Sequence, residues 1–165
     1  MDKHTAVLAD SMYVDKTKAA EDVSFELPSL ALQTADLQAM GTLSLPIAGL
    51  LDDMTMTITK IGVDKGYGSM NKLKKMAVEF RWVQDKVNAS GDVSHVGCKA
   101  FLNVVPQEIP GISVEVGSAT ELGGTYTVLR YQLYVDGSEV LLVDRLNQIL
   151  KINGVDYMAD VKKLL

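Results

Sequence analysis

The stretch TYTVLRYQLYVDGSEVLLVDRLNQILKINGVDYMADVKKLL, residues 125–165, says most about the fold of this chain. Asp136-Gly137 stands between two runs rich in Val, Leu and Tyr. A two-residue Asp-Gly turn takes positive φ at both positions, which is typical of a β-hairpin. Asn153-Gly154 predicts a second turn, and Asp156 is suited to cap a short helix after it. The apolar side of this helix is expected to carry Met158, Val161 and Leu165.

Alternation of apolar and polar residues predicts strands upstream. Residues 54–61 place Met54, Met56 and Ile58 on one face and three threonines on the other. Residues 77–87 and 93–105 predict strands joined by a turn at 88–92. The remaining predictions are one or two short strands in 4–14 broken at Asp10-Ser11, a polar connector at 16–22, extended chain over 23–39, a strand at 112–116 and a loop at 117–124.

One internal helix is predicted over residues 70–76. Ser69 is expected to cap it, with Met70 and Leu73 facing inward and the lysines exposed. The predicted fold class is therefore mainly β, a β-sandwich or open-barrel subunit with one internal helix and a short C-terminal helix. We expect a single domain over 1–165, with the packing of residues 1–20 left undefined.

Composition narrows the class of protein. The 165 residues are 47% apolar and 22% charged, which excludes a fully disordered chain. No apolar run approaches the length of a membrane span, and the first residues lack the apolar core of a secretory signal. The single cysteine, Cys98, permits no internal disulfide, so synthesis in a reducing bacterial cytoplasm is expected.

Charge is unevenly distributed along the chain. The net charge is −5, but residues 19–59 and 100–129 hold acids and no Lys or Arg, while the rest of the chain carries all 16 bases. This segregation predicts two surfaces with opposite electrostatic roles; chance clustering in a short chain is the alternative. Under either interpretation, the sequence lacks the basic patch that is typical of a nucleic-acid-binding protein.

The sequence contains no convincing catalytic or metal-binding group. His95 and Cys98 supply two metal ligands where zinc needs three or four, and as base and nucleophile they lack a third, orienting group. Gly66-Tyr67-Gly68 has too few glycines for dinucleotide binding. We therefore expect no enzyme activity, no metal and no cofactor.

Three other groups admit two interpretations. Asp52-Asp53 is either half of a carboxylate pair or a solvated strand end. Met40, Met54 and Met56 could line a ligand pocket, or they could form a deformable packing or subunit interface. Lys72, Lys74 and Lys75 form either a solvated helix face or a surface that meets an acidic partner.

The chain resembles the major tail tube proteins of contractile phages, a family that also forms the inner tube of R-type bacteriocins. The C-terminal order of strand, Asp-Gly, strand, Asn-Gly-Val-Asp and helix carries much of this resemblance. The rest lies in VSFELPSL at 23–30, Met40-Gly41 and the GLLDDM segment at 49–54. The resemblance covers most of residues 20–165.

This resemblance implies a structural, self-assembling protein. Family members form hexameric rings that stack into a hollow tube inside a contractile sheath, and strands of neighbouring subunits close an inner β-barrel. The implied partners are further copies of the chain, a tail sheath protein, a baseplate tube-initiator and a tape-measure protein in the lumen. Stable nucleic-acid binding and membrane insertion are not implied, and the assembled product is a virion tail or a released particle.

We combine the resemblance with the charge pattern to predict three surfaces. An acidic lumen or rim repels phosphate groups and lets DNA pass; its candidates are Asp36, Asp52, Asp53, Glu108, Glu115 and Glu121. Residues 41–51 are apolar and bent by Gly and Pro, which favours a loop between rings. The ring-stacking candidates are Met40, Gly41, Leu43, Leu45, Pro46 and Ile47. The sheath-facing candidates are Lys72, Lys74, Lys75, Lys162 and Lys163.

Two other classes of function remain open. One is a monomeric β-barrel that binds a small ligand in a pocket lined by Trp82, Phe80 and the methionines. The other is a small hydrolase using the carboxylates. A tube protein predicts rings or filaments of the purified protein, whereas a ligand-binding barrel predicts a monomer with one saturable site.

Overall fold

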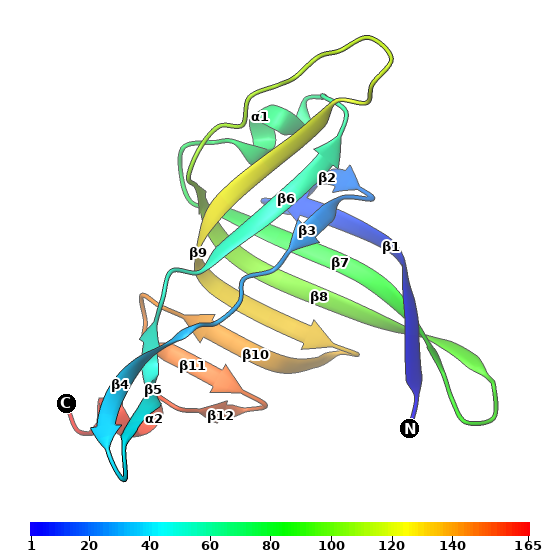
Figure 1. The fold of residues 1–165 in the computed structure, drawn as a ribbon. Coiled ribbons are helices and arrows are strands. Elements are labelled where there is room, and N and C mark those ends of the chain that lie inside the picture. The colour runs from blue at the N-terminus through cyan, green and yellow to red at the C-terminus, as the bar shows by residue number, and fades with distance from the viewer.

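Twelve strands and two short helices make up the computed structural model, which describes residues 1–165 (Figure 1). The mainly β class with one internal and one C-terminal helix is confirmed. The elements are β1 Lys3–Val14, β2 Thr17–Glu21, β3 Ser24–Glu26, β4 Leu32–Gln38, β5 Thr42–Leu51, β6 Thr55–Ile61, α1 Gly66–Met70, β7 Met76–Val87, β8 Val93–Pro106, β9 Glu121–Val135, β10 Ser138–Asp144, β11 Ile149–Ile152, β12 Val155–Asp156 and α2 Ala159–Lys163.

Ten of the strands form one antiparallel sheet in the order β12-β11-β10-β9-β8-β7-β1-β2, from which β6 and β3 branch. The branch point is β9. Its N-terminal half pairs with β6, from Thr55 opposite Thr127 to Ile61 opposite Glu121. Its C-terminal half pairs with β10 and β8. The sheet has free edges and does not close within one chain.

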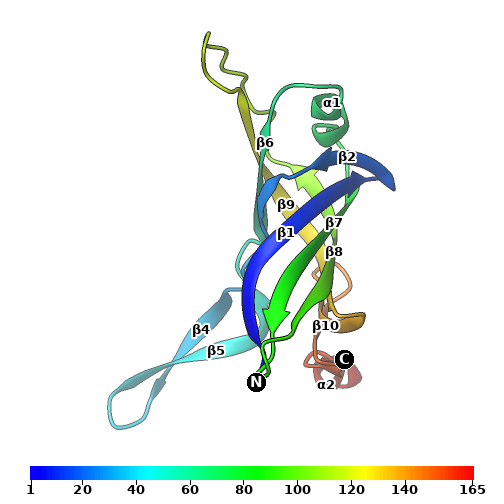
Figure 2. The ribbon, with the colours of Figure 1, turned by 90° about the vertical axis from the view of Figure 1, so that its right-hand side faces the viewer.

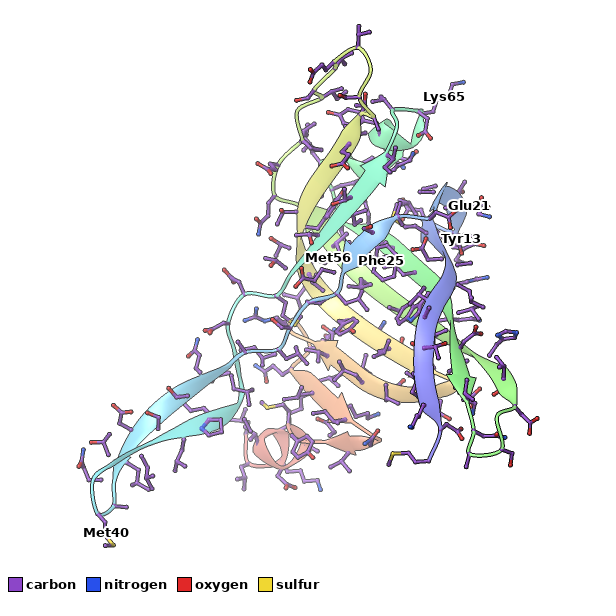
Figure 3. The ribbon with its side chains drawn as sticks, turned by 45° about the vertical axis from the view of Figure 1, so that its right-hand side comes forward. Tyr13, Glu21, Phe25, Met40, Met56 and Lys65 are labelled. Carbon is purple, nitrogen blue, oxygen red and sulfur yellow. The ribbon has the colours of Figure 1, made fainter.

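The core lies where β3 and β6 cover the strands β1, β7 and β8 (Figure 3). Phe80, Met56 and Tyr126 are at most 2% exposed. The alternation predicted for residues 54–61 is confirmed, since Met54, Met56 and Ile58 are buried and the threonines between them are exposed. Burial of one face of a strand therefore accounts for this part of the pattern.

The three turns that the sequence predicts most strongly are present. Asp136 and Gly137 have φ of 51° and 77°, and Asn153 and Gly154 have φ of 49° and 82°. The turn at 88–92 joins β7 to β8. The strand after Asp136-Gly137 is broken, however, because Gln148 takes a φ of 54° in a turn between β10 and β11.

The N-terminal segment differs from the prediction. Residues 4–14 do not break at Asp10-Ser11, because β1 continues through both residues, with Asp10 opposite Trp82 and Ser11 opposite Arg81 on β7. The Asp10 carboxylate accepts a hydrogen bond from the Val23 N–H at 2.9 Å. Burial of this carboxyl raises its pKa. The predicted polar connector at 16–22 is strand β2, which pairs with β1 after a turn in which Asp15 and Lys16 both have positive φ.

The internal helix lies earlier than predicted. Asp64 accepts hydrogen bonds from the Gly66 N–H at 2.7 Å and from Lys60 Nζ at 2.6 Å, which organises a turn ahead of Ser69. These contacts hold the pKa of the Asp64 carboxyl below its ordinary value, the Lys60 hydrogen bond having the largest effect. The helix ends at Met70, which is buried as predicted, whereas Leu73 is 79% exposed.

Two other predictions are corrected. Residues 112–116 form no strand; they lie in an irregular loop over 107–120, and Val116 is fully exposed. The predicted loop at 117–124 ends early because β9 begins at Glu121 and pairs with β6. The C-terminal helix is shorter than expected. Met158 packs against the core, while Val161 and Leu165 are exposed, so the predicted apolar stripe is not covered within one chain.

Candidate assembly surfaces

The β4–β5 hairpin projects away from the rest of the molecule (Figure 1, Figure 2). Its two strands pair only with each other. Every residue of β4 is exposed, as are most residues of β5. Met40, with a φ of 53°, and Gly41, with a φ of 118°, turn the chain at the tip (Figure 3). The predicted loop at 41–51 is thus a strand, because pairing with β4 gives its backbone regular hydrogen-bonding partners.

One face of this hairpin is apolar. Residues that are opposite each other in an antiparallel pair point to the same side. Ala35 is opposite Leu45, and Leu37 is opposite Leu43. Leu37, Leu43 and Leu45 are between 46% and 49% exposed. We refer to these four residues as the apolar hairpin face.

The other face is polar. Successive residues of a strand alternate between faces, so the residues between those of the apolar hairpin face share the opposite side. Asp36 is opposite Ser44, whose hydroxyl donates a hydrogen bond to the carboxylate at 3.0 Å. The polar hairpin face comprises Thr34, Asp36, Gln38, Thr42 and Ser44. An isolated hairpin with one exposed apolar face is marginally stable in water, so this arrangement favours contact with another molecule.

The ring-stacking candidates come together on this hairpin. Met40 and Gly41 form its tip, and Leu43 and Leu45 belong to the apolar hairpin face. Pro46, opposite Thr34, is exposed and Ile47 is half-buried.

The six acidic candidates are all exposed, but they do not form one continuous group. Asp36 is on the hairpin, and Asp52 and Asp53 follow its base. The other three lie toward the opposite end of the molecule, in the 107–120 loop and at the start of β9 (Figure 1). Tyr67 anchors this loop to α1, since its hydroxyl donates a hydrogen bond to the Pro110 carbonyl oxygen at 2.8 Å.

The lysine candidates also form two groups. Lys72, Lys74 and Lys75 follow α1 and are exposed; Lys72 Nζ lies 3.7 Å from an Asp15 carboxylate oxygen. Lys162 and Lys163 belong to α2. In Figure 2 α1 lies at the upper right and α2 at the lower right, whereas the 107–120 loop lies at the upper left and the β4–β5 hairpin at the lower left. The lysine-bearing segments thus lie on the other side of the molecule from the tips of the base-free projections, although Tyr67 of α1 contacts the 107–120 loop and Met158 at the start of α2 contacts the hairpin base.

The residues considered for catalysis lie apart. His95 Nδ1 is 2.5 Å from Asp85 Oδ1, so a carboxylate orients this imidazole, which the sequence did not predict. Cys98, however, is buried while His95 is exposed. Burial also raises the pKa of the Cys98 thiol, which disfavours the reactive thiolate.

The residues proposed for a ligand pocket do not share one. Phe80, Met54 and Met56 fill the core, whereas Met40 is fully exposed at the hairpin tip. Trp82 does line a hollow of about 600 Å³, together with side chains that include Arg81 and Lys99. Of the two interpretations of the methionines, packing therefore applies to Met54 and Met56, and none of the three methionines lines this hollow.

No three His, Cys, Asp or Glu side chains in residues 1–165 lie close enough together to hold a metal ion. Neither α1 nor α2 has the length and apolar character that a membrane-crossing helix needs.

Known proteins can be compared with this arrangement. The fold is similar to a chain of the sheath–tube complex of an extracellular contractile injection system, PVC, determined by cryo-EM in its extended state. The TM-score is 0.52 with 14% sequence identity, and the match covers 76% of this chain and 87% of the other. No curated protein matches the sequence.

The open β-rich subunit therefore shares its fold with a chain of that complex. Residues 7–165 match the phage tail tube protein FII family, and the chain belongs to that family. Its role is that of a structural component of a phage tail tube.

Proposed function

We propose that copies of this protein form hexameric rings that stack into the hollow inner tube of a contractile phage tail or a phage-tail-like bacteriocin. The observation that carries the proposal is the two-faced β4–β5 hairpin. Its apolar hairpin face is exposed in the single chain and would be buried against a second copy. Its polar hairpin face carries one acid and no base, which suits a water-filled channel.

Open sheet edges provide a second reason for assembly. Residues 3–9 of β1 pair with β7 on one side only, since contacts with residues 21–23 begin at Asp10 and Ser11. Val7 and Leu8 within this edge are 58% and 55% exposed. An unpaired apolar edge promotes uncontrolled association, and closure around a ring removes it.

The uneven distribution of charge supports different roles for different surfaces of each subunit. We infer that the base-free hairpin and the 107–120 loop contribute to the lumen or its rim, with Asp36, Asp52, Asp53, Glu108, Glu115 and Glu121 as candidates. Negative groups there disfavour adhesion of the nucleic-acid backbone. Lys72, Lys74, Lys75, Lys162 and Lys163 would then face outward and complement an acidic surface of the sheath.

The tip and the apolar side of the hairpin are the proposed ring-to-ring contact. Heterologous contacts that do not close produce filaments, so a projection received by the next ring extends the tube along its axis. The candidates are Met40 and Gly41 at the tip, Leu43 and Leu45 on the apolar hairpin face, and the adjoining Pro46 and Ile47; Pro46, opposite Thr34, lies on the side of the polar hairpin face. A baseplate initiator would begin this series, and a tape-measure protein would occupy the lumen.

Negative-stain microscopy of the purified protein tests the proposal, together with size-exclusion chromatography over a range of concentrations. We expect rings and tubes with a central channel and sixfold symmetry in end-on views. A protein that stays monomeric at every concentration and forms no rings or tubes would contradict it. Rings of another symmetry would retain a tube but exclude the hexamer.

A further inference from the structure

The base of the β4–β5 hairpin is held at two points by the C-terminal part of the chain. This matters because β4 and β5 form no sheet with any other strand. The register of the hairpin slips at its base, where Leu32 is opposite Leu51 but Thr34 is opposite Pro46. The extra residues of β5 form a bulge that includes Gly49, with a φ of 90°.

Met158 fills the space left by the missing side chain of Gly49. A Cβ on Gly49 would overlap Met158 Sδ and lie 2.9 Å from its Cε. Met158 also packs against the main core, and its N–H donates a hydrogen bond to Asp156 Oδ1 at 2.9 Å. One side chain at the start of α2 thus contacts both the bulge and the body of the molecule.

Arg145 holds the end of β5. Its Nη2 donates to the Leu51 carbonyl oxygen at 2.8 Å, and its Nη1 donates to the Asp52 carbonyl oxygen at 2.9 Å. The Arg145 N–H donates to the Leu129 carbonyl oxygen at 3.1 Å, which ties the same residue to β9. Two parallel bonds from a planar guanidinium restrict both distance and direction more than a single bond does.

Hydrogen bonds connect the turn that carries Arg145 to helix α2. Asn147 donates through its backbone N–H and its side-chain amide to the Asp144 carboxylate, at 3.1 and 2.8 Å. Lys162 Nζ donates to the Asn147 carbonyl oxygen at 2.7 Å. Helix α2 and the turn that carries Arg145 are therefore linked, so both contacts on the hairpin base come from one supported unit.

We propose that Arg145 and Met158 form a clamp that fixes the direction in which the β4–β5 hairpin projects, which makes them positioning residues for assembly. This inference rests on the proposed tube function, because a hairpin that must reach a second copy needs a defined direction. A free hairpin loses entropy on each addition, whereas a clamped one is already oriented. The clamp also places α2, with two of the proposed sheath-facing lysines, in contact with the proposed ring-stacking element.

The test compares Arg145→Lys and Met158→Ala with the control Asp160→Asn, which alters an exposed side chain on α2 that has no proposed role in binding. Hydrogen exchange of the unassembled full-length protein is measured first. We expect residues 31–53 to exchange roughly tenfold faster in both clamp variants, because the lost contacts stabilise only the hairpin base. Exchange within β7 and β8 should be unchanged, and Asp160→Asn should match the parent protein.

Assembly is then followed by light scattering and microscopy. Both clamp variants should elongate several-fold more slowly than the parent and the control, and the double variant should lose less than the product of the two single effects because both residues act on one base. Unchanged exchange of residues 31–53 would overturn the clamp even if tubes form normally. Faster exchange with unchanged elongation would overturn its role in assembly. If neither the parent nor the control assembles, the proposed function fails, while the exchange result still decides whether the clamp exists.

Discussion

The ring of Phe25 lies over the ring of Phe80, with centroids 4.2 Å apart and planes inclined by 19°. Phe25 belongs to the three-residue strand β3, and Phe80 is in the middle of β7. Trp82 meets Phe25 edge to face, with ring centroids 5.6 Å apart. This aromatic contact joins the β3–β6 layer to the sheet beneath it.

Replacing Phe25 by Ala should destabilise the folded chain by about 3 kcal/mol, because the substitution removes apolar packing and the aromatic pair together. Urea denaturation followed by Trp82 fluorescence measures the change. Glu26→Ala, on the exposed side of the same strand, serves as the control and should change stability by less than about 0.5 kcal/mol. Equal effects of the two substitutions would contradict the role given to the aromatic contact.

Leu45→Glu should prevent tube formation while leaving the unassembled protein folded. The substitution places a charge on the apolar hairpin face, where burial against a second copy would require its desolvation. Ser44→Glu places the same charge on the adjacent residue of the polar hairpin face and should still permit tubes. Microscopy and thermal unfolding of both variants test this pair, and long tubes formed by Leu45→Glu would exclude that face from the interface.

Acid should weaken the turn that carries the clamp. Burial opposes ionisation of Asp144, but hydrogen bonds from Asn147 and the nearby Arg130 charge outweigh it and lower the pKa of the carboxyl. The unfolded carboxyl titrates near pH 3.9. The stability from Asp144 is therefore complete above that pH and is lost as the pH falls through the lower pKa of the folded state.

Asp144→Asn should accordingly be less stable at neutral pH and should lose less stability on acidification than the parent. Urea denaturation at several pH values compares the two slopes, with Asp160→Asn on α2 as the control. Identical pH dependence of parent and Asp144→Asn would refute this assignment.

Alkali should unfold the protein partly through Tyr126. Burial raises the pKa of this phenol to about 12, while an unfolded tyrosine titrates near 10. The folded state holds the proton more tightly, so stability is complete below about pH 10 and is lost as the pH rises through the folded pKa. Tyr126→Phe keeps the ring, removes the ionisation and should shift alkaline unfolding upward.

Phenolate absorbance and circular dichroism recorded together check this expectation. Burial also raises the pKa of Tyr131, so Tyr126→Phe should remove only part of the effect. Tyr157, which is 50% exposed, provides a matched control. An alkaline midpoint that moves as much in Tyr157→Phe as in Tyr126→Phe would argue against a role for burial.

Strong local signals predicted structure well. Asp136-Gly137 and Asn153-Gly154 impose turns through their own backbone preferences, and the alternation at residues 54–61 reports directly on burial. Predictions from weaker local signals were wrong where contacts between residues distant in sequence determine the backbone conformation. Asp15 and Lys16 make a turn without glycine because β2 pairs with β1, and Asp64 starts its turn through Lys60.

The surfaces were predictable only in part. Acidic and apolar residues of the hairpin could be selected from composition, but their division into two faces depends on the register that pairs Leu37 with Leu43. The clamp was not predicted, because Arg145 and Met158 are far in sequence from the hairpin base that they contact and neither belongs to a motif. The one available sign in the sequence was Gly49, because an isolated glycine within an apolar strand often marks a place where another part of the chain packs closely against the backbone.

The branching of the sheet at β9 has a consequence for how the chain folds. The strands β6, β8 and β10 all pair with this 15-residue strand. Neither the β3–β6 layer nor the sheet that it covers can therefore be completed before residues 121–135 are synthesised. Hairpins such as β7–β8 can form early from local contacts, whereas the β6–β9 pairing must close a loop of about 60 residues. We therefore expect folding to be limited by the arrival of β9, which leaves the methionine-rich face of β6 uncovered on the growing chain until then.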